Sequence, residues 1–286
     1  MIEFQIIGAQ HSLTMETKIT TERHGDTMNQ KKLSERKVLI TAASSGIGFA
    51  IASVLAEKGA AVFMTSGSSR IKDSADVLGK RGFKVQSSIY NMVTDDPATI
   101  VEKASESMGG IDTLVVNYGD PTLAPFMDLR DEDWDRYISM FIRATIGLVR
   151  ETAKIIEGDG RIVFITSMTT REAYEGFAIS GSLRAAVVNL GKILSLELGR
   201  KGITVNSISQ GYFLTERLNA VLERNALLNR TPLEEEKRKI ISSIPVGRIG
   251  EPEEIGHLVS FLCSPEASYI NGANIPIDGG LTRYPY

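Results

Sequence analysis

A glycine-containing turn directly after an apolar run has the residue types that bind phosphate. Glycines let the backbone approach a diphosphate closely, while the free amides and the positive dipole end of a following helix favour its negative charge. The same pattern also fits a simple tight turn between a strand and a helix. Because the turn follows the first apolar run of an alternating pattern, we predict that it binds a dinucleotide. The residues assigned to this turn are Thr41, Ser44, Ser45, Gly46, Ile47 and Gly48.

The residues after the second apolar run bear on which dinucleotide binds. An acidic side chain there would bind the adenosine ribose hydroxyls and repel a 2′-phosphate. The run at 61–65 is instead followed by three serines, a glycine and Arg70, and the first acidic residue is Asp73. Hydroxyls and a guanidinium can hold a phosphate through charge-assisted hydrogen bonds. We therefore expect NADP(H) rather than NAD(H); the alternative is that Arg70 faces solvent.

Short apolar runs alternate with amphipathic segments from residue 37 onward. Runs that are nearly continuously apolar are typical of strands covered on both faces, and the alternation predicts repeated βαβ units with right-handed crossovers. We expect an α/β fold, in which residues 35–286 form a single domain around one doubly wound, mostly parallel Rossmann-type sheet. Ligands then belong at the carboxyl ends of the strands. The expected strands are 38–41, 61–65, 113–116, 161–166, 204–207 and 274–277, and the expected helices include 47–58, 96–108, 134–156 and 183–200.

Composition narrows the class of protein. The chain has 286 residues, of which 42% are hydrophobic and 23% charged, and its net charge of −3 argues against a nucleic-acid partner. It lacks the apolar run of about 18 residues that a membrane span needs and the pattern of a secretory signal, so we expect a cytoplasmic protein. The single cysteine, Cys263, lies in an apolar run and is expected to be a small buried side chain. The scattered histidines predict no metal site.

The first 34 residues are polar and show no sustained period. We expect residues 1–34 to form a flexible extension; alternatively, Met28 is the biological start. Near the other end, residues 214–243 combine a helical pattern with a run of charges, and we expect them to form a mobile lid over the substrate. The charges also fit a solvated helix face.

Several motifs resemble those of the short-chain dehydrogenase/reductase family. The turn at 41–48 is similar to the family's Thr-Gly-x-x-x-Gly-x-Gly element with Ala42 at the first glycine, and 116–119 is similar to Asn-Asn-Ala-Gly. Residues 211–215 resemble Pro-Gly-x-x-x-Thr, and 245–280 looks most like 3-oxoacyl-carrier-protein reductases and their relatives. The resemblance covers about residues 36–282 and implies a homotetramer that assembles through two long helices and the C-terminal strand region. It also implies cofactor contacts by Asn117, Gly119, Gly211 and Thr215.

The same resemblance implies a catalytic site in which three of four expected side chains are replaced. Members of the family use an asparagine, a serine, a tyrosine and a lysine four residues after the tyrosine. The serine is present as Ser167, whereas the tyrosine and lysine positions carry Ser180 and Arg184, and the asparagine position carries Phe141. Residues at i and i+4 share one helix face. The paired geometry therefore survives, although Ser-x-x-x-Arg stands where the family has Tyr-x-x-x-Lys.

This replacement changes the available chemistry. A phenol starts from a pKa of ~10, whereas a seryl hydroxyl is a far weaker acid, and losing general acid catalysis costs on the order of 10²–10⁴ in rate. Arg184 can hydrogen-bond the nicotinamide ribose, but it cannot give up a proton. Tyr174, in the loop between Ser167 and Ser180, is a candidate phenol. The alternative for Tyr174 is packing into that loop.

Two functions follow from these residues. The first is an oxidoreductase that transfers a hydride between NADP(H) and a small carbonyl or alcohol, 3-oxoacyl-reductase-like, with Ser167 and Ser180 orienting the substrate oxygen and Arg184 fixing the ribose. The second is a non-catalytic dinucleotide-binding protein that acts as a sensor or assembly partner. Substrate-dependent loss of NADPH absorbance would distinguish the two.

Overall fold

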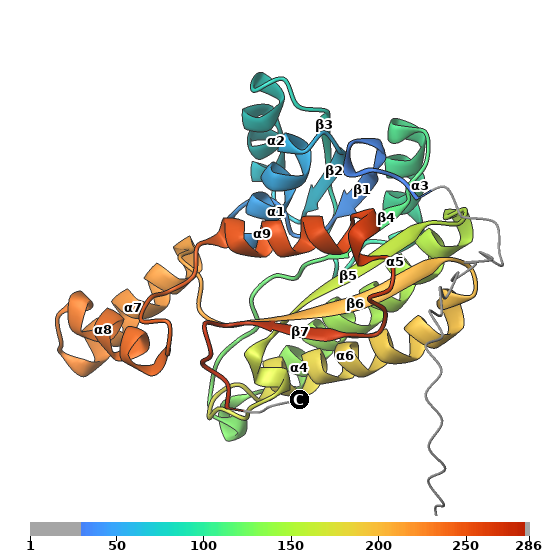
Figure 1. Cartoon of the computed structure of the whole chain (residues 1–286). Coiled ribbons are helices and arrows are strands. Elements are labelled where there is room, and N and C mark those ends of the chain that lie inside the picture. Colours follow the sequence, from blue (N-terminus) through green and yellow to red (C-terminus); the bar gives the residue numbers. More distant parts are fainter. Residues whose placement is uncertain (1–29, 284–286) are drawn as a thin grey trace, which may run out of the picture.

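Seven parallel strands form one sheet at the centre of the computed structural model, which describes residues 30–283 (Figure 1). The strand order is β3-β2-β1-β4-β5-β6-β7, so the chain winds outward in both directions from β1. This confirms the predicted doubly wound α/β fold in one domain. The strands are β1 (Lys37–Ile40), β2 (Ala61–Ser66), β3 (Val85–Ile89), β4 (Thr113–Val116), β5 (Gly160–Ser167), β6 (Ile203–Gln210) and β7 (Asn274–Ile277).

Helices cover both faces of the sheet (Figure 1). One apolar core lies between the sheet and α3, α5 and α6, and the other lies between the sheet and α1, α2 and α9. Burial on both faces explains why the central strands read as continuous apolar runs. The helices are α1 (Gly46–Glu57), α2 (Arg70–Lys80), α3 (Pro97–Met108), α4 (Asp131–Ile138), α5 (Ala144–Ile155), α6 (Ala178–Gly199), α7 (Glu216–Asn229), α8 (Leu233–Ser243) and α9 (Pro252–Leu262).

The expected helix at 134–156 is divided in the structure. One π-helical turn, Ser139–Arg143, separates α4 from α5. A π-helical turn inserts one extra residue into the hydrogen-bonding pattern, and such turns occur frequently at functional sites. This one contains Phe141, whose side chain is completely buried.

Arginine and aspartate side chains form a buried ionic cluster at the amino ends of the strands. Both Arg36 and Arg161 are nearly inaccessible, and each pairs with Asp159, at 2.7 Å from Arg36 Nη2 and 2.5 Å from Arg161 Nη1. Asp112 lies 3.8 Å from Arg36 and accepts a hydrogen bond of 3.0 Å from Lys31 Nζ. The cluster therefore joins the residues that precede β1, β4 and β5.

The described part of the predicted extension 1–34 is attached to this cluster. The Lys31 backbone amide donates to the Asp159 carboxylate at 2.8 Å, and Leu33 packs against the core. Residues 1–29 lie outside the described residues, and so does the alternative start at Met28. The 34/35 boundary itself stays a prediction.

Helices α7 and α8 project beyond the sheet as a separate helical pair (Figure 1). They span most of the predicted lid at 214–243, and Leu218 and Leu222 form a small apolar cluster with Ile244 and Ile249. The lid segment is therefore attached by its own small core rather than by the main ones.

Cys263 is completely buried, as predicted, and burial raises the pKa of its thiol to about 12. Within residues 30–283, none of the helices is long and apolar enough to cross a bilayer. The same residues contain no group of three or more His, Cys, Asp or Glu side chains arranged to hold a metal ion.

Candidate active site

A cleft of about 360 Å³ opens at the carboxyl ends of the strands, the edge where the sequence predicts a ligand. Its wall joins the turn before α1 to the start of α6 and to the first turns of α7. Of the predicted site residues, the cleft brings together Ser44, Ser45, Gly46, Ile47, Asn117, Gly119, Ser167, Ser180, Arg184, Gly211 and Thr215. Thr41, Gly48, Arg70 and Tyr174 do not line it.

The turn before α1 has the geometry of an anion-binding helix start. Gly46 adopts a φ of +52°, which favours glycine, and a Cβ at this position would lie 3.4 Å from Thr215 Cγ2. Ser45 stands at the N-cap without a side-chain capping hydrogen bond, so the first-turn amides are available to a ligand. This open, positively polarised turn fits the diphosphate of a dinucleotide.

Two of the turn's residues, together with Asn117 after β4, hold the turn in place. A Cβ at Gly48 would lie 2.3 Å from the Ala42 carbonyl oxygen, so only glycine allows this approach of α1 to β1. The buried Thr41 hydroxyl donates to the Asn117 carbonyl at 2.6 Å and accepts from the Asn117 amide at 3.0 Å. The Asn117 side chain then donates to the Ala42 carbonyl at 3.0 Å. Thr41 and Gly48 therefore position the turn from outside the cleft.

Ala42 stands at the position of the motif's first glycine and has a left-handed backbone, with φ at +48°. For an L-residue this conformation costs about 1–2 kcal/mol, which glycine avoids. We predict that Ala42→Gly raises the free energy of unfolding by about 1 kcal/mol in urea denaturation. Ala43→Gly is the matched control: Ala43 is buried without a positive φ, so that change should lower stability. Destabilisation by both changes would contradict the strain at Ala42.

Two exposed ion pairs connect the start of α7 to the start of α2 and to the segment after β4. The two terminal guanidinium nitrogens of Arg70, at the start of α2, donate to the Glu216 carboxylate at 2.8 Å each. On the other side, Arg217 Nε lies 3.6 Å from Asp120, which follows β4. Arg70 is therefore half-exposed and paired with a carboxylate. The sequence analysis considered a phosphate or free solvent around Arg70, but not this ion pair.

The hydroxyls of Ser167 and Ser180 both lie close to Thr169. Ser167 Oγ accepts from the Thr169 backbone amide at 3.2 Å, and Ser180 Oγ lies 3.3 Å from Thr169 Oγ1. Ser180 is buried in the first turn of α6, while Ser167 ends β5. Two hydroxyl groups thus line the same cleft, and both can orient a substrate oxygen.

Arg184 lies one turn further along α6, against two aromatic rings whose centres are 4.8 Å apart. Its guanidinium carbon is 4.8 Å from the centre of the Phe141 ring and 5.6 Å from that of Tyr118. Nη1 donates to the Ile165 carbonyl at 3.1 Å, and the buried Nε has no hydrogen-bond partner within residues 30–283. Burial lowers the pKa of Arg184, which Tyr118 and Asp120 partly offset. An arginine nonetheless stays protonated.

Tyr174 occupies a neighbouring hollow rather than the cleft. Its hydroxyl donates to Glu172 at 3.1 Å, and its ring packs on Phe177, with ring centres 5.9 Å apart. Burial, reinforced by Glu172, raises its pKa to about 12. A phenol with a raised pKa holds its proton more tightly, which makes it a weaker general acid near neutral pH.

The sequence analysis did not identify two contributors to the cleft. Tyr118 lines it and is buried, with its hydroxyl 2.8 Å from Thr145 Oγ1. Gln210 also lines it and has a buried Oε1 without a partner in the described chain. The sequence carried a signal for each: Tyr118 stands where the family's Asn-Asn-Ala-Gly turn has alanine, and Gln210 stands where its Pro-Gly-x-x-x-Thr motif has proline.

Comparisons with known proteins identify the family of the chain. The family model described as enoyl-(acyl carrier protein) reductase matches residues 41–282. The chain is 35% identical to oxidoreductase UcpA of Salmonella typhimurium, covering 88% of this chain and 96% of that protein. It is 30% identical to the 3-oxoacyl-acyl-carrier-protein reductase FabG of Vibrio cholerae, covering 87% and 98%.

Solved structures show the same fold. A short-chain dehydrogenase/reductase from Serratia marcescens superimposes with a TM-score of 0.78 at 30% identity, covering 88% of this chain and 99% of that one. A single-substitution variant of the actinorhodin polyketide ketoreductase, solved with NADPH, gives a TM-score of 0.83 at 27% identity, with coverage of 89% and 100%. The chain therefore belongs to the short-chain dehydrogenase/reductase family and is an NAD(P)-dependent short-chain oxidoreductase.

Proposed function

We propose that this enzyme transfers a hydride between NADP(H) and a small carbonyl or alcohol substrate, in the manner of a 3-oxoacyl reductase but with an altered catalytic pair. One observation carries the proposal: a single cleft connects the open turn at Gly46 with Ser167, Ser180 and Arg184. A dinucleotide held at the turn by its diphosphate can extend along this cleft to the two serines. The relatives named as reductases support the same reaction class.

Each group of the cleft then has a role. The first-turn amides beside Gly46 hold the diphosphate, and Arg184 donates to the nicotinamide ribose. Ser167 and Ser180 hydrogen-bond the substrate oxygen and keep the reacting carbon in place. When bound, NADP(H) supplies or accepts the hydride. As the carbonyl carbon gains the hydride, its oxygen takes a proton from water, which leaves hydroxide. We assign this proton to water rather than to Tyr174, because Tyr174 lies outside the cleft.

The direct test is a panel of aldehydes, ketones and 3-oxoacyl thioesters mixed with the protein and NADPH. The proposal expects substrate-dependent loss of NADPH absorbance that Ser167→Ala lowers about 10²-fold or more, within the range for acid–base and orienting groups. The matched control is Ser182→Ala, close to the cleft wall in sequence but absent from it. NADPH binding without turnover on any substrate would contradict the proposal and favour the binding-only function.

We propose that Arg70 binds the 2′-phosphate of NADP(H), and Arg70→Ala tests this. Charge-assisted hydrogen bonds contribute about 1.5–3 kcal/mol, so we predict an NADPH Kd raised about 10- to 100-fold with little change for NADH. Titration calorimetry measures both. Glu216→Gln is the control: it frees Arg70 from its partner and should leave NADPH binding unchanged or tighter. An equal loss for both cofactors would refute this role.

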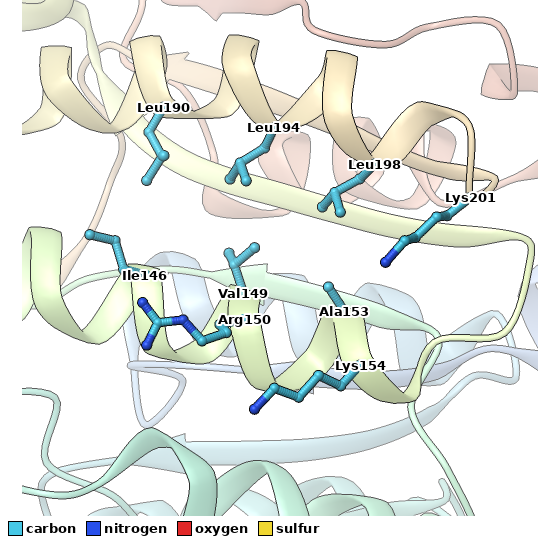
Figure 2. A pocket seen from close by; sticks show the side chains of 9 residues that line it. All are labelled: Ile146, Val149, Arg150, Ala153, Lys154, Leu190, Leu194, Leu198 and Lys201. Atoms are coloured by element: carbon cyan, nitrogen blue, oxygen red, sulfur yellow. The ribbon is translucent and has the colours of Figure 1, made fainter.

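We propose that the enzyme is a homotetramer whose contacts include a groove of about 320 Å³ between α5 and α6. Figure 2 shows the side chains of Leu190, Leu194 and Leu198 facing Val149 and Ala153. Exposed apolar surface of this kind marks a site of association. We predict that Leu194→Glu shifts the mass in light scattering to a smaller species. Leu196 is exposed and lies outside the groove, so Leu196→Glu should leave the mass unchanged. If Leu196→Glu disrupts the assembly and Leu194→Glu does not, the subunit contact lies outside the groove.

We propose a cytoplasmic location. The one cysteine is buried with a raised pKa, so the chain has no thiol poised for disulfide chemistry. Fractionation of cells that make the protein would test this placement.

A further inference from the structure

We propose that Arg184 binds a carboxylate of the substrate, so that the substrate is a carbonyl compound, or the corresponding alcohol, with a negative charge close to its reacting carbon. This inference rests on the proposed function and specifies its substrate class. Four observations support it: the burial of Arg184, its missing counterion, the two adjacent rings packed against it and its place in the same cleft as Ser167.

The buried arginines of this protein differ in their partners. Arg36 and Arg161 both pair with Asp159. Arg184 is also buried, with 5% of its surface exposed, yet within residues 30–283 it forms no ion pair and its one hydrogen bond goes to a backbone carbonyl. A buried cation without a counterion is costly. Because this one lines the cleft, a ligand can supply the missing negative charge.

The two aromatic rings determine how an anion can approach. Phe141 and Tyr118 lie at the guanidinium and attract it through their π faces, which compensates part of the cost of burial. The rings offer no hydrogen-bond acceptor to the N–H groups, which point out along the edge of the guanidinium plane. The remaining donors therefore suit a carboxylate in that plane, the pairing that guanidinium groups form most strongly.

The location of Arg184 links this anion to the reacting carbonyl. Its Nη1 donates to the Ile165 carbonyl, two residues before Ser167 along β5. Ser167 is paired in register with Gln210 at the end of β6. A small anion at Arg184 would thus share the cleft with the Ser167 hydroxyl, which can donate, while the Gln210 oxygen can only accept from a neutral O–H or N–H of the substrate. A guanidinium has five N–H donors, so contact with the ribose and with a carboxylate is possible at once.

The negative charge could come from the substrate or from the diphosphate of the dinucleotide. The diphosphate already has a site at Gly46, so we assign Arg184 to the substrate. The experiment uses the full chain with NADPH bound and two probes: oxamate, which carries a carboxylate, and ethyl oxamate, its neutral ester. Calorimetry gives the Kd of each for the wild type, Arg184→Lys and Arg184→Met.

The expected result is oxamate binding at least tenfold tighter than ethyl oxamate in the wild type. Arg184→Met should weaken oxamate at least tenfold more than it weakens NADPH, and Arg184→Lys should retain part of the oxamate affinity. Equal binding of the two probes would overturn the inference. So would a loss of NADPH affinity as large as the loss of oxamate affinity, which would assign the arginine to the cofactor alone.

Thermal unfolding of the free protein provides a second readout. If Arg184 serves to bind a ligand, Arg184→Met should keep or raise the Tm of the free protein. The same change should abolish the rise in Tm that oxamate causes. Arg161→Met is the matched buried control and should lower the Tm, because it breaks a paired charge. A similar fall in both variants would mean that Arg184 is structural. If the wild type binds no NADPH, the proposed function fails; if NADPH binds but oxamate does not, only this inference fails.

Discussion

Replacing Ser180 by tyrosine together with Arg184 by lysine is expected to raise the turnover of neutral carbonyl substrates about 10²- to 10⁴-fold, the usual contribution of general acid catalysis. The side chain of Ser180 lines the cleft, so a phenol at this position would enter it. A lysine four residues later lies on the same helix face and would lower the pKa of that phenol. Steady-state measurement of kcat with NADPH and a neutral ketone checks the expectation.

The single changes separate the contributions. Ser180→Tyr alone should give a smaller gain, because the phenol would lie beside an arginine already held by Phe141 and Tyr118. Arg184→Lys alone should give none, because the seryl hydroxyl remains a poor acid. For an anionic ketone, the double change should also raise KM. No gain in kcat from the double change would mean that the natural reaction takes its proton by another route and does not lack an acid at this position.

Asp159→Asn is expected to lower the free energy of unfolding by about 3–5 kcal/mol, the usual cost of breaking a buried ion pair by removing one partner. The carboxylate pairs with both Arg36 and Arg161, whose side chains are almost completely buried. Once it is neutral, the two guanidinium groups face each other with only Asp112 nearby. Urea denaturation followed by fluorescence or circular dichroism measures the change.

The matched control is an ion pair of similar length at the surface. Arg248 and Glu254 lie 2.7 Å apart with exposed side chains, so Glu254→Gln should cost at most about 1 kcal/mol. Cofactor binding by the folded Asp159→Asn variant should be unchanged, because the cluster lies at the amino ends of the strands. A small loss in both variants would show that water reaches the cluster.

Much of the fold could be predicted from apolar periodicity, and its failures have physical causes. The six expected strands are all present: five of them are largely buried, whereas Asn274–Ile277 is a partly exposed edge strand whose two isoleucines still gave an apolar signal. The missed strand, Val85–Ile89, lies at the edge of the sheet and reads Val-Gln-Ser-Ser-Ile, so it has no continuous apolar run. The π-helical turn at Ser139–Arg143 was also missed, because the apolar residues keep a helical spacing through it and do not reveal the inserted residue.

The site was predictable in its residues but not in its contacts. Motif spacing brought Gly46, Ser167, Ser180 and Arg184 to one cleft. Spacing could not show that Phe141, at the replaced asparagine position, packs on Arg184, because the two are far apart in the sequence and meet only through the fold. The pairing of Arg70 with Glu216 likewise joins distant segments.

The sheet places its two groups of buried arginines at opposite ends. Arg36 and Arg161 lie where the strands begin, whereas Arg184 donates to Ile165 near the end of β5; at about 3.3 Å per residue, the four residues from Arg161 to Ile165 put roughly 13 Å of strand between the two places. Substitutions this far apart, without shared partners, have additive effects. Substitutions around Arg184 could therefore change the chemistry of the cleft while the ionic cluster continues to stabilise the fold. This separation would make the protein a suitable starting point for laboratory evolution.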